Sequence, residues 1–300
     1  MQTKIKYKLL SPVSHIGEVA STGSYFQSIL THCGRVPVIT GNSIRGQIRD
    51  SIAIDLLSRL NVKVDKDIFN IFFSGGNING TMKEDVEKAK KVREHFPSIS
   101  LLGGGLGDMI MSGKLISSFA FPICQETTDI TGEFSDKSWK NMIEEIEFTR
   151  TDDSKNDVKA KYIEDTTAAI SAKASTQMRF SVQYMAAGTE FVQDIYFLDG
   201  TNDLEKGAFY AGLAQWFKYP KLGGMAAKGF GMFDAVVGDD DIVLTQGKMQ
   251  ISDQIKQLID NYHDFVDRER DEWFVLLKDK GGEKNGKKAN GAAKGDSQVN

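Results

Sequence analysis

This sequence of 300 residues has little of the two residue types that most often hold metals or cross-link small domains. It contains 2 cysteines, Cys33 and Cys124, which argues against both a disulfide framework and a cysteine zinc site. Its 4 histidines, at positions 15, 32, 95 and 263, show no metal-ligand spacing. We therefore expect neither a dedicated metal site nor another bound cofactor.

Long apolar runs and an excess of positive charge are also missing. No stretch approaches the ~20 apolar residues of a membrane span, and the opening Met-Gln-Thr-Lys-Ile-Lys lacks the apolar core of a signal peptide. We therefore expect a soluble, cytoplasmic protein of one or two domains. The formal net charge of −4 does not by itself indicate a nucleic-acid partner. Such a partner would require positive side chains to gather on one face.

Glycine is abundant instead, with 29 residues that form clusters at 103–107, 223–224 and 229–231. No Gly-Lys-Ser/Thr closes any cluster, so none is a P-loop. Gly103-Gly104-Gly105 lacks the βαβ unit and later acidic residue of a dinucleotide site. Two interpretations stay open. The glycines serve turns and close packing, or they let the backbone approach a nucleic acid strand, helped at 228–231 by Lys228.

Catalytic groupings are weak in this sequence. His15 has no nearby nucleophile, and the aspartates at 239–241 fit a solvated turn better than a metal site. The polar stretch 147–179 carries basic residues that fit either a solvated loop or an RNA-contacting hairpin: Arg150, Lys155, Lys159, Lys161, Lys173 and Arg179.

The most informative stretch runs from residue 36 to residue 49. A short apolar run is followed by a predicted helix over 43–60, with Asn42 and Ser43 as candidate N-caps. Arg45 and Arg49 share one face of this helix, and Gly46 suggests that something approaches the backbone there. The apolar residues at helical spacing form a buried stripe: Ile44, Ile48, Ile52, Leu56 and Leu60. A helix N-terminus with two arginines suits a phosphate chain, but an ordinary amphipathic helix with solvated arginines explains the pattern equally well.

Strand and helix patterns alternate along the rest of the chain. Strands are predicted at 4–10, 114–123, 177–186, 190–198 and up to 237, and helices also at 83–95, 204–217 and 250–278. Residues 12–36 are predicted to be a loop, 124–178 an inserted excursion, and 187–189 the turn of a hairpin. The tail from 279 has a disordered composition. The order predicts an α+β fold with a ferredoxin-like (RRM-like) core, which also suits RNA.

Four motifs together resemble those of a known family. Residues 37–49 resemble the Pro-x-Ile-Pro-Gly-Ser-Ser-Leu-Lys-Gly-x-Leu-Arg motif of the RAMP superfamily of CRISPR-associated proteins. His15-Ile16-Gly17 is similar to its His-x-Gly loop, residues 180–191 to its central hairpin, and 222–231 to its C-terminal glycine-rich loop. The resemblance spans residues 3–237. The variant of the first motif, with Leu-Gly-Gly-Gly-Leu-Gly-Asp-Met at 102–109, looks most like the backbone subunit of type IV complexes.

The resemblance implies a structural role. Many copies would polymerise as a helical filament along the guide RNA (crRNA), with other CRISPR effector subunits capping the ends. The filament would present the guide bases for pairing with target DNA or RNA. The resemblance implies phosphate contacts from Asn42, Ser43, Arg45 and Arg49, with His15 in the same groove. The further RNA-contacting residues that we expect are Arg150, Lys159, Lys161, Arg179, Gly223, Gly224, Lys228 and Gly229.

The resemblance up to residue 237, together with the residue pattern beyond it, predicts how the chain is divided. The core would comprise residues 1–122 and 179–249, including a helical insertion. An inserted thumb region with its hairpin would occupy 123–178, a C-terminal helix 250–278, and a disordered tail 279–300.

One departure from the family pattern bears on activity. Type III relatives that cut target RNA use an aspartate between the His-x-Gly loop and the next motif. Between Gly17 and Val36 this sequence has Glu18 but no aspartate, so we expect a non-catalytic subunit. Two alternatives stay open: a RAMP endoribonuclease that processes CRISPR RNA with His15 as general base, and a glycine-rich nucleotide-binding enzyme.

Overall fold

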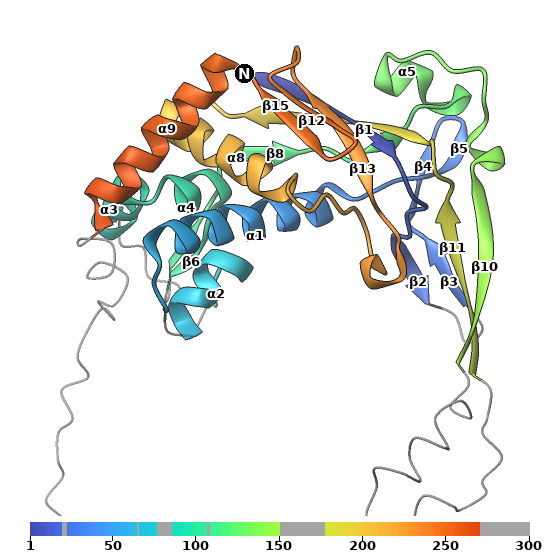
Figure 1. Ribbon diagram of the computed structural model, residues 1–300, viewed down its shortest axis with the longest axis horizontal. Helices are drawn as coiled ribbons and strands as arrows, with labels where there is room; N and C mark the ends of the chain where they lie inside the picture. The colour runs from blue at the N-terminus through green and yellow to red at the C-terminus, as the bar shows by residue number, and fades with distance from the viewer. Residues whose placement is uncertain (20–22, 65, 77–85, 107–108, 151–177, 271–300) are drawn as a thin grey trace, which may run out of the picture.

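The computed structural model describes residues 1–19, 23–64, 66–76, 86–106, 109–150 and 178–270. Among these residues, a central antiparallel sheet lies over a layer of helices, and a second sheet extends from one end of the molecule (Figure 1). The predicted α+β class is therefore confirmed. Lys159, Lys161 and the predicted disordered tail lie outside the described residues.

The central sheet has the strand order β15-β14-β13-β1-β12-β8. Each of these neighbours is antiparallel, and Ile5 of β1 lies opposite Gln193 of β12. The strands are β1 (Gln2–Leu9), β8 (Leu115–Ser117), β12 (Glu190–Phe197), β13 (Phe233–Val237), β14 (Ile242–Thr245) and β15 (Lys248–Ile251). A further short strand, β9 (Phe121–Pro122), also pairs with β12. The sheet therefore joins the first residues of the chain to segments about two hundred residues later.

Strand β1 forms because its side chains alternate between apolar and charged. Ile5, Tyr7 and Leu9 are buried on the inner face, and the lysines between them point outward. One of these, Lys6, forms an ion pair of 2.7 Å with Glu133. The predicted half-buried strand is confirmed, although it begins two residues earlier than predicted.

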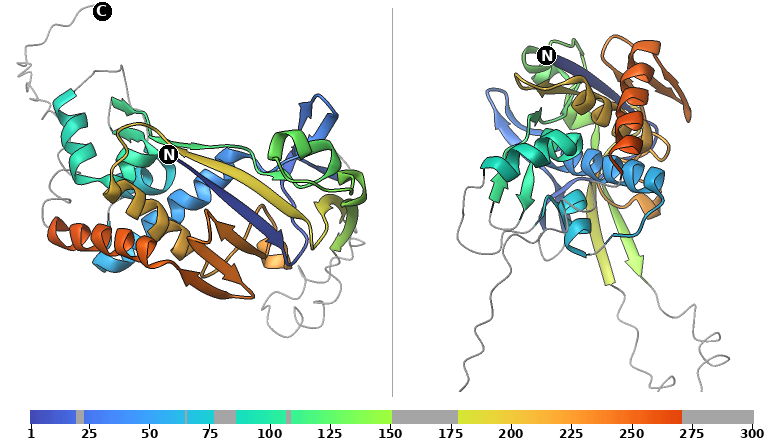
Figure 2. Two further views of the ribbon diagram at one scale, coloured as in Figure 1. Left: turned by 90° about the horizontal axis from the view of Figure 1, so that it is seen from above. Right: turned by 90° about the vertical axis from the view of Figure 1, so that its left-hand side faces the viewer.

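The helical layer consists mainly of α1 (Gly41–Leu60), α8 (Asp203–Trp216) and α9 (Asp253–Arg268). Helix α8 packs on both α1 and α9, and the views of Figure 2 agree with this arrangement. Aromatic side chains pack between the sheet and the helices. The ring centroid of Tyr7 on β1 lies 6.2 Å from that of Trp216 on α8 and 5.3 Å from that of Phe233 on the neighbouring β13. The helices predicted at 43–60 and 204–217 are confirmed with small shifts in their ends.

Two glycines of α8 allow the helices to approach closely. A Cβ at Gly212 would collide with Ile52 of α1, and one at Gly207 would collide with the Leu258 carbonyl oxygen of α9. Because the second obstacle is backbone, it has little freedom to move.

Short elements cover the end of the molecule beside α9. They are α2 (Lys66–Ser74), α3 (Val86–His95), α4 (Pro97–Leu102), β6 (Gly104–Leu106) and β7 (Met109–Met111). Pro97 ends α3 and occupies the first position of α4, where its missing N–H costs nothing. The helix predicted over 83–95 is confirmed for residues 86–95, whereas α2 and α4 were not predicted.

The loop predicted at 12–36 is wrong. These residues contribute β2 (Ile16–Val19), β3 (Gly23–Phe26), β4 (Ser28–Thr31) and β5 (Gly34–Pro37). Strand β3 pairs in parallel with β11 (Met178–Met185), which pairs with β10 (Ile143–Arg150), so the second sheet has the order β10-β11-β3-β2. The pairing of β3 with β11 is too distant in sequence to leave a local signal, whereas β2 with β3 and β4 with β5 are local antiparallel pairs that the sequence analysis missed.

The hairpin predicted between residues 177–186 and 190–198 is also wrong. Both strands exist, but β11 belongs to the second sheet and β12 to the central one. The backbone after β1 takes the hydrogen bonds that a hairpin would need. Val13 exchanges hydrogen bonds of 3.0 and 2.9 Å with Met185, and Leu9 bonds with Gly188 and Thr189. Residues 186–189 are therefore a corner between two sheets.

Two other predictions need smaller corrections, and the turn predicted at 239–241 is confirmed. The strand predicted over 114–123 is split into β8 and β9. Residues 239–241 form a turn between β13 and β14 in which Asp240 has φ of 65°. The helix predicted from residue 250 begins at Asp253, because β15 extends to Ile251 and the Ser252 side chain caps the helix. Of the expected insertion, residues 123–150 contain α5 (Thr128–Thr131), short 3-10 turns and β10.

Glycine-to-alanine substitutions in two helices should have opposite effects on stability. Gly207→Ala should lower the free energy of unfolding by about 1–3 kcal/mol, because its Cβ meets backbone. Gly46→Ala should raise it by ~0.5–1 kcal/mol, because nothing lies within 4 Å of its Cβ and alanine favours the helix. Urea unfolding of both variants measures this, and equal effects would contradict the packing described.

Candidate nucleic-acid interface

The N-terminus of α1 is held tightly against the central sheet. A Cβ at Gly41 would collide with the carbonyl oxygens of Ser117 and Ser118, so glycine is required at this contact. The Ser117 hydroxyl donates to the Gly41 carbonyl oxygen at 3.1 Å. Ser117 in turn accepts from Gln193 Nε2 at 2.7 Å, and Gln193 Oε1 accepts from the buried Tyr7 hydroxyl at 3.0 Å. This chain of hydrogen bonds fixes the start of the helix.

Thr40 caps α1, and not Asn42 or Ser43 as predicted. Its hydroxyl oxygen accepts from the Ser43 N–H at 3.3 Å, so the helix begins at Gly41. Asn42 is exposed and Ser43 half-buried in the first turn, which contains no acidic side chain. The first turn therefore presents the positive end of the helix dipole without a neutralising carboxylate.

His15 is joined to this cap. Its Nε2 accepts from the Thr40 N–H at 3.1 Å, so a neutral His15 carries its proton on Nδ1. Burial lowers the pKa of His15 below its ordinary 6.5, which favours this neutral form. The structure thus brings His15 beside the first turn of α1.

The glycine-rich loop 222–231 packs against the residues just before His15. Gly224 N–H donates to the Ser14 carbonyl oxygen at 2.8 Å, and a Cβ at Gly223, whose φ is 65°, would collide with the same oxygen. Gly231 N–H donates to the Pro12 carbonyl oxygen at 2.7 Å. Three segments distant in sequence therefore meet here, and they include the predicted site residues His15, Asn42, Ser43, Gly223 and Gly224.

Arg45 and Arg49 share one face of α1, as predicted, and point to the end of α4. Both guanidinium groups donate to the Leu102 carbonyl oxygen, that of Arg49 at 2.9 Å, and Arg49 also donates to Gly103 at 3.0 Å. Burial, with a smaller contribution from Arg45, lowers the pKa of Arg49 to about 10, so it remains charged at neutral pH. The two arginines line an open cleft of about 380 Å³.

Glycines form most of the other walls of this cleft. Gly105 N–H donates to the Gly75 carbonyl oxygen at 2.6 Å, and a Cβ at Gly76 would collide with the Gly105 carbonyl oxygen. Two glycine segments thus touch backbone to backbone beside Arg49. Of the two interpretations of the cluster at 103–105, close packing is the one that these contacts require.

The remaining predicted residues lie near the second sheet. Lys228 Nζ lies 4.2 Å from the ring centroid of Phe148 and 4.5 Å from that of Phe180, two rings that stack across β10 and β11. Gly229 follows with φ of 85° in a turn. Arg179 is exposed on β11, and Arg150 ends β10, where only its backbone is described. Sequence reasoning missed the aromatic partners of Lys228, because they lie about 50 and 80 residues away.

Within the described residues, no three side chains of His, Cys, Asp or Glu gather as metal ligands. None of the helices in this part of the chain is both long and apolar enough to cross a membrane.

Comparison with known proteins now decides the family. A family model described as the RAMP superfamily matches residues 6–234. The chain belongs to the RAMP superfamily. Among solved structures, this RAMP protein resembles a chain of a "Type IV-B CRISPR Complex", with a TM-score of 0.58 and 16% identity over 86% of this chain and 99% of the other. At that identity the likeness concerns the fold. No curated protein matches the sequence.

The stability of this RAMP chain should depend on pH through His15. Because the pKa of His15 is lowered by folding, the unfolded chain binds a proton that the folded chain does not. The stabilisation is present above about pH 6.5 and is lost as the pH falls below it. We expect His15→Gln, whose carbonyl oxygen accepts from Thr40 without titrating, to flatten the fall in unfolding free energy between pH 7.5 and 5. Urea unfolding at both pH values measures it.

The control is His32→Gln. His32 is exposed and makes no contact with Thr40, so the flattening that removal of the Thr40 contact causes is expected in His15→Gln and not in this variant. An unchanged slope in His15→Gln would show that the contact with Thr40 does not control the titration.

Proposed function

We propose that this RAMP chain is a non-catalytic backbone subunit of a CRISPR ribonucleoprotein effector complex. Copies of it polymerise along crRNA and present the guide bases for pairing with target DNA or RNA, and other effector subunits cap the filament. The observation that carries the proposal is the junction of three segments at the N-terminus of α1. There residues 12–15 form hydrogen bonds with the cap of α1 on one side and with the glycine loop 222–231 on the other.

The connectivity supports a ferredoxin-like core for this subunit. In chain order, β1, α1, β8 with β9, β12, α8 and β13 follow one another, and the sheet order β13-β1-β12-β8 is that of a split βαβ unit. We propose the core at residues 1–122 and 179–249 and the inserted thumb at 123–178, followed by a C-terminal helix that begins at Asp253. The strand β10 begins within the proposed thumb and is anchored to the core by β11.

The junction suits a phosphate chain for three reasons. The first turn of α1 lacks acidic side chains and presents backbone N–H groups. The Nδ1–H of neutral His15 is a hydrogen-bond donor. Gly224 is exposed at this junction, although its N–H already donates to the Ser14 carbonyl oxygen. Contacts of this kind grip phosphates without reading bases, which a guide RNA requires.

The two rival functions have weaker support. In the endoribonuclease alternative, His15 would need a free basic nitrogen, but Nε2 already accepts from Thr40. In the nucleotide-binding alternative, the glycine clusters would cradle phosphates, but those at 75–76 and 103–105 are occupied by backbone packing. The missing aspartate between Gly17 and Val36 further supports a subunit that does not cleave its target.

Purification of the full chain with a co-expressed CRISPR array tests the proposal. We expect multi-copy particles that contain RNA of uniform length, detected by sedimentation velocity and by sequencing of the bound RNA. Two results would count against the proposal: a monomer without nucleic acid, or a monomer that cleaves repeat RNA without metal.

A negative charge in the first turn of α1 separates the structural from the RNA-binding role. Asn42→Asp should stabilise the helix by about 0.3–1 kcal/mol through the dipole, yet weaken RNA binding about tenfold at low salt by repelling phosphate. The matched control is Gln254→Asp, at the equivalent exposed position of α9, which should leave RNA affinity unchanged. Filter binding and urea unfolding give the two readouts.

This test is sharper than removal of Arg45 and Arg49. Those side chains also hold the Leu102 and Gly103 carbonyl groups, so their loss would disturb the glycine segment. If Asn42→Asp binds RNA as tightly as the wild type does, the first turn of α1 is not the phosphate site.

A further inference from the structure

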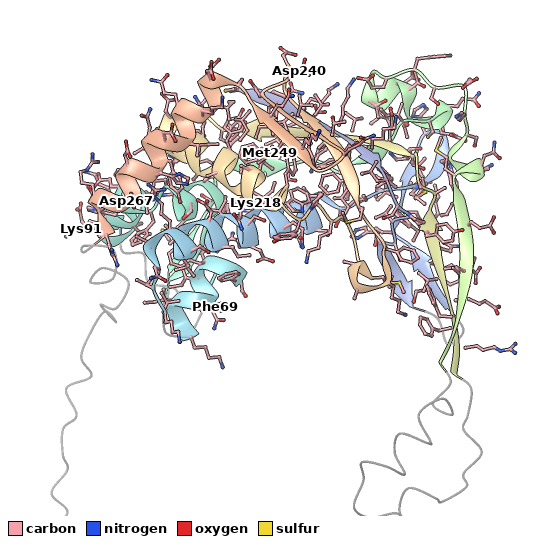
Figure 3. The ribbon with its side chains drawn as sticks, in the orientation of Figure 1. Phe69, Lys91, Lys218, Asp240, Met249 and Asp267 are labelled. Atoms are coloured by element: carbon pink, nitrogen blue, oxygen red, sulfur yellow. The ribbon has the colours of Figure 1, made fainter. Side chains whose placement is uncertain are left out.

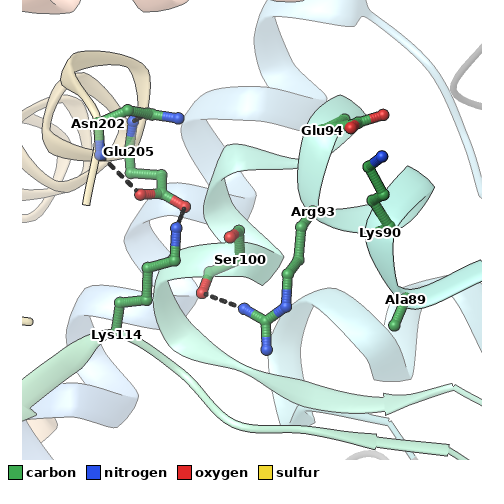
Figure 4. A pocket seen from close by; sticks show the side chains of 8 residues that line it. All are labelled: Ala89, Lys90, Arg93, Glu94, Ser100, Lys114, Asn202 and Glu205. Carbon is green, nitrogen blue, oxygen red and sulfur yellow. Dashed lines mark hydrogen bonds and ion pairs between the residues drawn. The ribbon is translucent and has the colours of Figure 1, made fainter. Parts of the chain in front are cut away.

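A cavity of about 440 Å³ lies among the short helices that cover the end of the molecule beside α9, and Figure 4 shows the side chains that line it. It is lined by residues of α3 and α4, by Lys114, which precedes β8, and by the start of α8. Lys90, Arg93 and Lys114 contribute three cations, whereas Glu94 and Glu205 contribute two carboxylates. The lining therefore carries one positive charge in excess.

Most of these groups are already held in place. Lys114 Nζ lies 2.7 Å from Glu205 Oε1, and Glu205 Oε2 also accepts from the Asn202 N–H at 2.9 Å. Arg93 donates to the carbonyl oxygens of Ser100 and Ser112. Both carboxylate oxygens of the buried Glu205 thus already have partners within the chain. Lys114 and Arg93 are held in fixed positions by their hydrogen bonds.

Three side chains of the lining have no hydrogen bond or ion pair among the described residues, namely Ser100, Lys90 and the exposed Glu94, and the first two can bind a carboxylate. The Ser100 side chain is 1% exposed, and its hydroxyl has no hydrogen-bond partner among the described residues. A buried hydroxyl without a partner is costly, so it marks a place for a ligand atom. Lys90 is exposed at the rim, and none of the ion pairs within the described part of the chain uses it. A donor-rich cavity with excess positive charge suits a carboxylate.

Carboxylates are concentrated at the other end of the molecule. Glu145 and Glu147 lie on one face of β10, about 7 Å apart along the strand, and both are exposed. Their carboxylates take part in none of the ion pairs given by the described residues. Among the described residues, β10 is the edge strand of its sheet and no strand pairs with its outer side. Without a positive surface to meet them, charged residues on an edge strand would serve only to prevent its pairing with strands of other molecules.

We propose that the acidic edge of β10 in one copy docks on this cavity in the next copy, with Glu145 and Glu147 facing Lys90 and the Ser100 hydroxyl. A second copy is the occupant that fits, because its exposed glutamates on β10 are opposite in charge to the positive lining of the cavity. The two surfaces lie at opposite ends of the longest axis, with Lys91 marking the α3 end (Figures 1 and 3). A contact between different surfaces at opposite ends propagates as a chain. The inference rests on the proposed multi-copy assembly.

Charge reversal at each surface tests this contact. Lys90→Glu and Glu145→Lys should each raise about tenfold the concentration needed for half-maximal assembly on a long RNA, measured by sedimentation velocity. The matched controls are Lys91→Glu, next along α3 but outside the cavity lining, and Glu144→Lys, on the other face of β10. Both controls should assemble as the wild type does.

The double variant Lys90→Glu with Glu145→Lys should restore assembly, because each contact regains opposite charges. If the single reversals assemble normally, or if the double variant assembles no better than they do, the proposed contact is wrong. Titration with inorganic phosphate adds a second check. Tight phosphate binding that Lys90→Glu abolishes while assembly is unaffected would make the cavity a small-anion site and overturn the proposal.

Failure of the contact is distinguishable from failure of the proposed function. All of these variants should bind a short RNA that accommodates one copy with wild-type affinity, because their substitutions lie away from the α1 junction. A wild type that never forms multi-copy particles would overturn the function itself. If the wild type forms multi-copy particles and both charge-reversal variants form them equally well, only the proposed interface is wrong.

Discussion

The contact between the first turn of α1 and the central sheet is the constraint on which the rest of the site depends. Gly41 packs against the carbonyl oxygens of Ser117 and Ser118. The carbonyl oxygen of Gly41 accepts from Ser117, which is linked through Gln193 to Tyr7 by further hydrogen bonds. Because Thr40 directly precedes this anchored glycine, its N–H is fixed where His15 accepts it. A buried polar network of this kind is stabilising only when its members are satisfied together.

The local distribution of charge in this protein is more informative than its net charge. A chain of net charge −4 leaves the first turn of α1 free of carboxylates, while exposed glutamates gather on β10. The proposed phosphate grip and the proposed contact between copies thus use separate regions of opposite sign. This separation explains why composition alone gives no hint of a nucleic-acid partner, since averaging cancels both regions.

Residues with a strong local period were predicted well. The alternation in β1 and the apolar stripe of α1 are consequences of burying one face, which any neighbour enforces. Segments whose structure depends on distant partners were missed. Strand β3 joins the second sheet through the distant β11, and the corner after Met185 exists because Val13 takes the hydrogen bonds that β12 would otherwise share.

The sequence by itself determined the order of the main elements, the buried faces of β1 and α1, and the motifs that place the chain in the RAMP superfamily, because these depend on neighbours within a few residues. Only the tertiary structure decided that Thr40 and not Asn42 caps α1, and that Arg45 and Arg49 hold the end of α4. It also decided that Lys228 rests on the rings of β10 and β11. The contacts of the two arginines and of Lys228 join segments far apart in the chain, and no local pattern encodes them. The Thr40 cap is local, but the neighbouring Asn42 and Ser43 are equally good capping residues in the sequence, so only the backbone geometry distinguishes them.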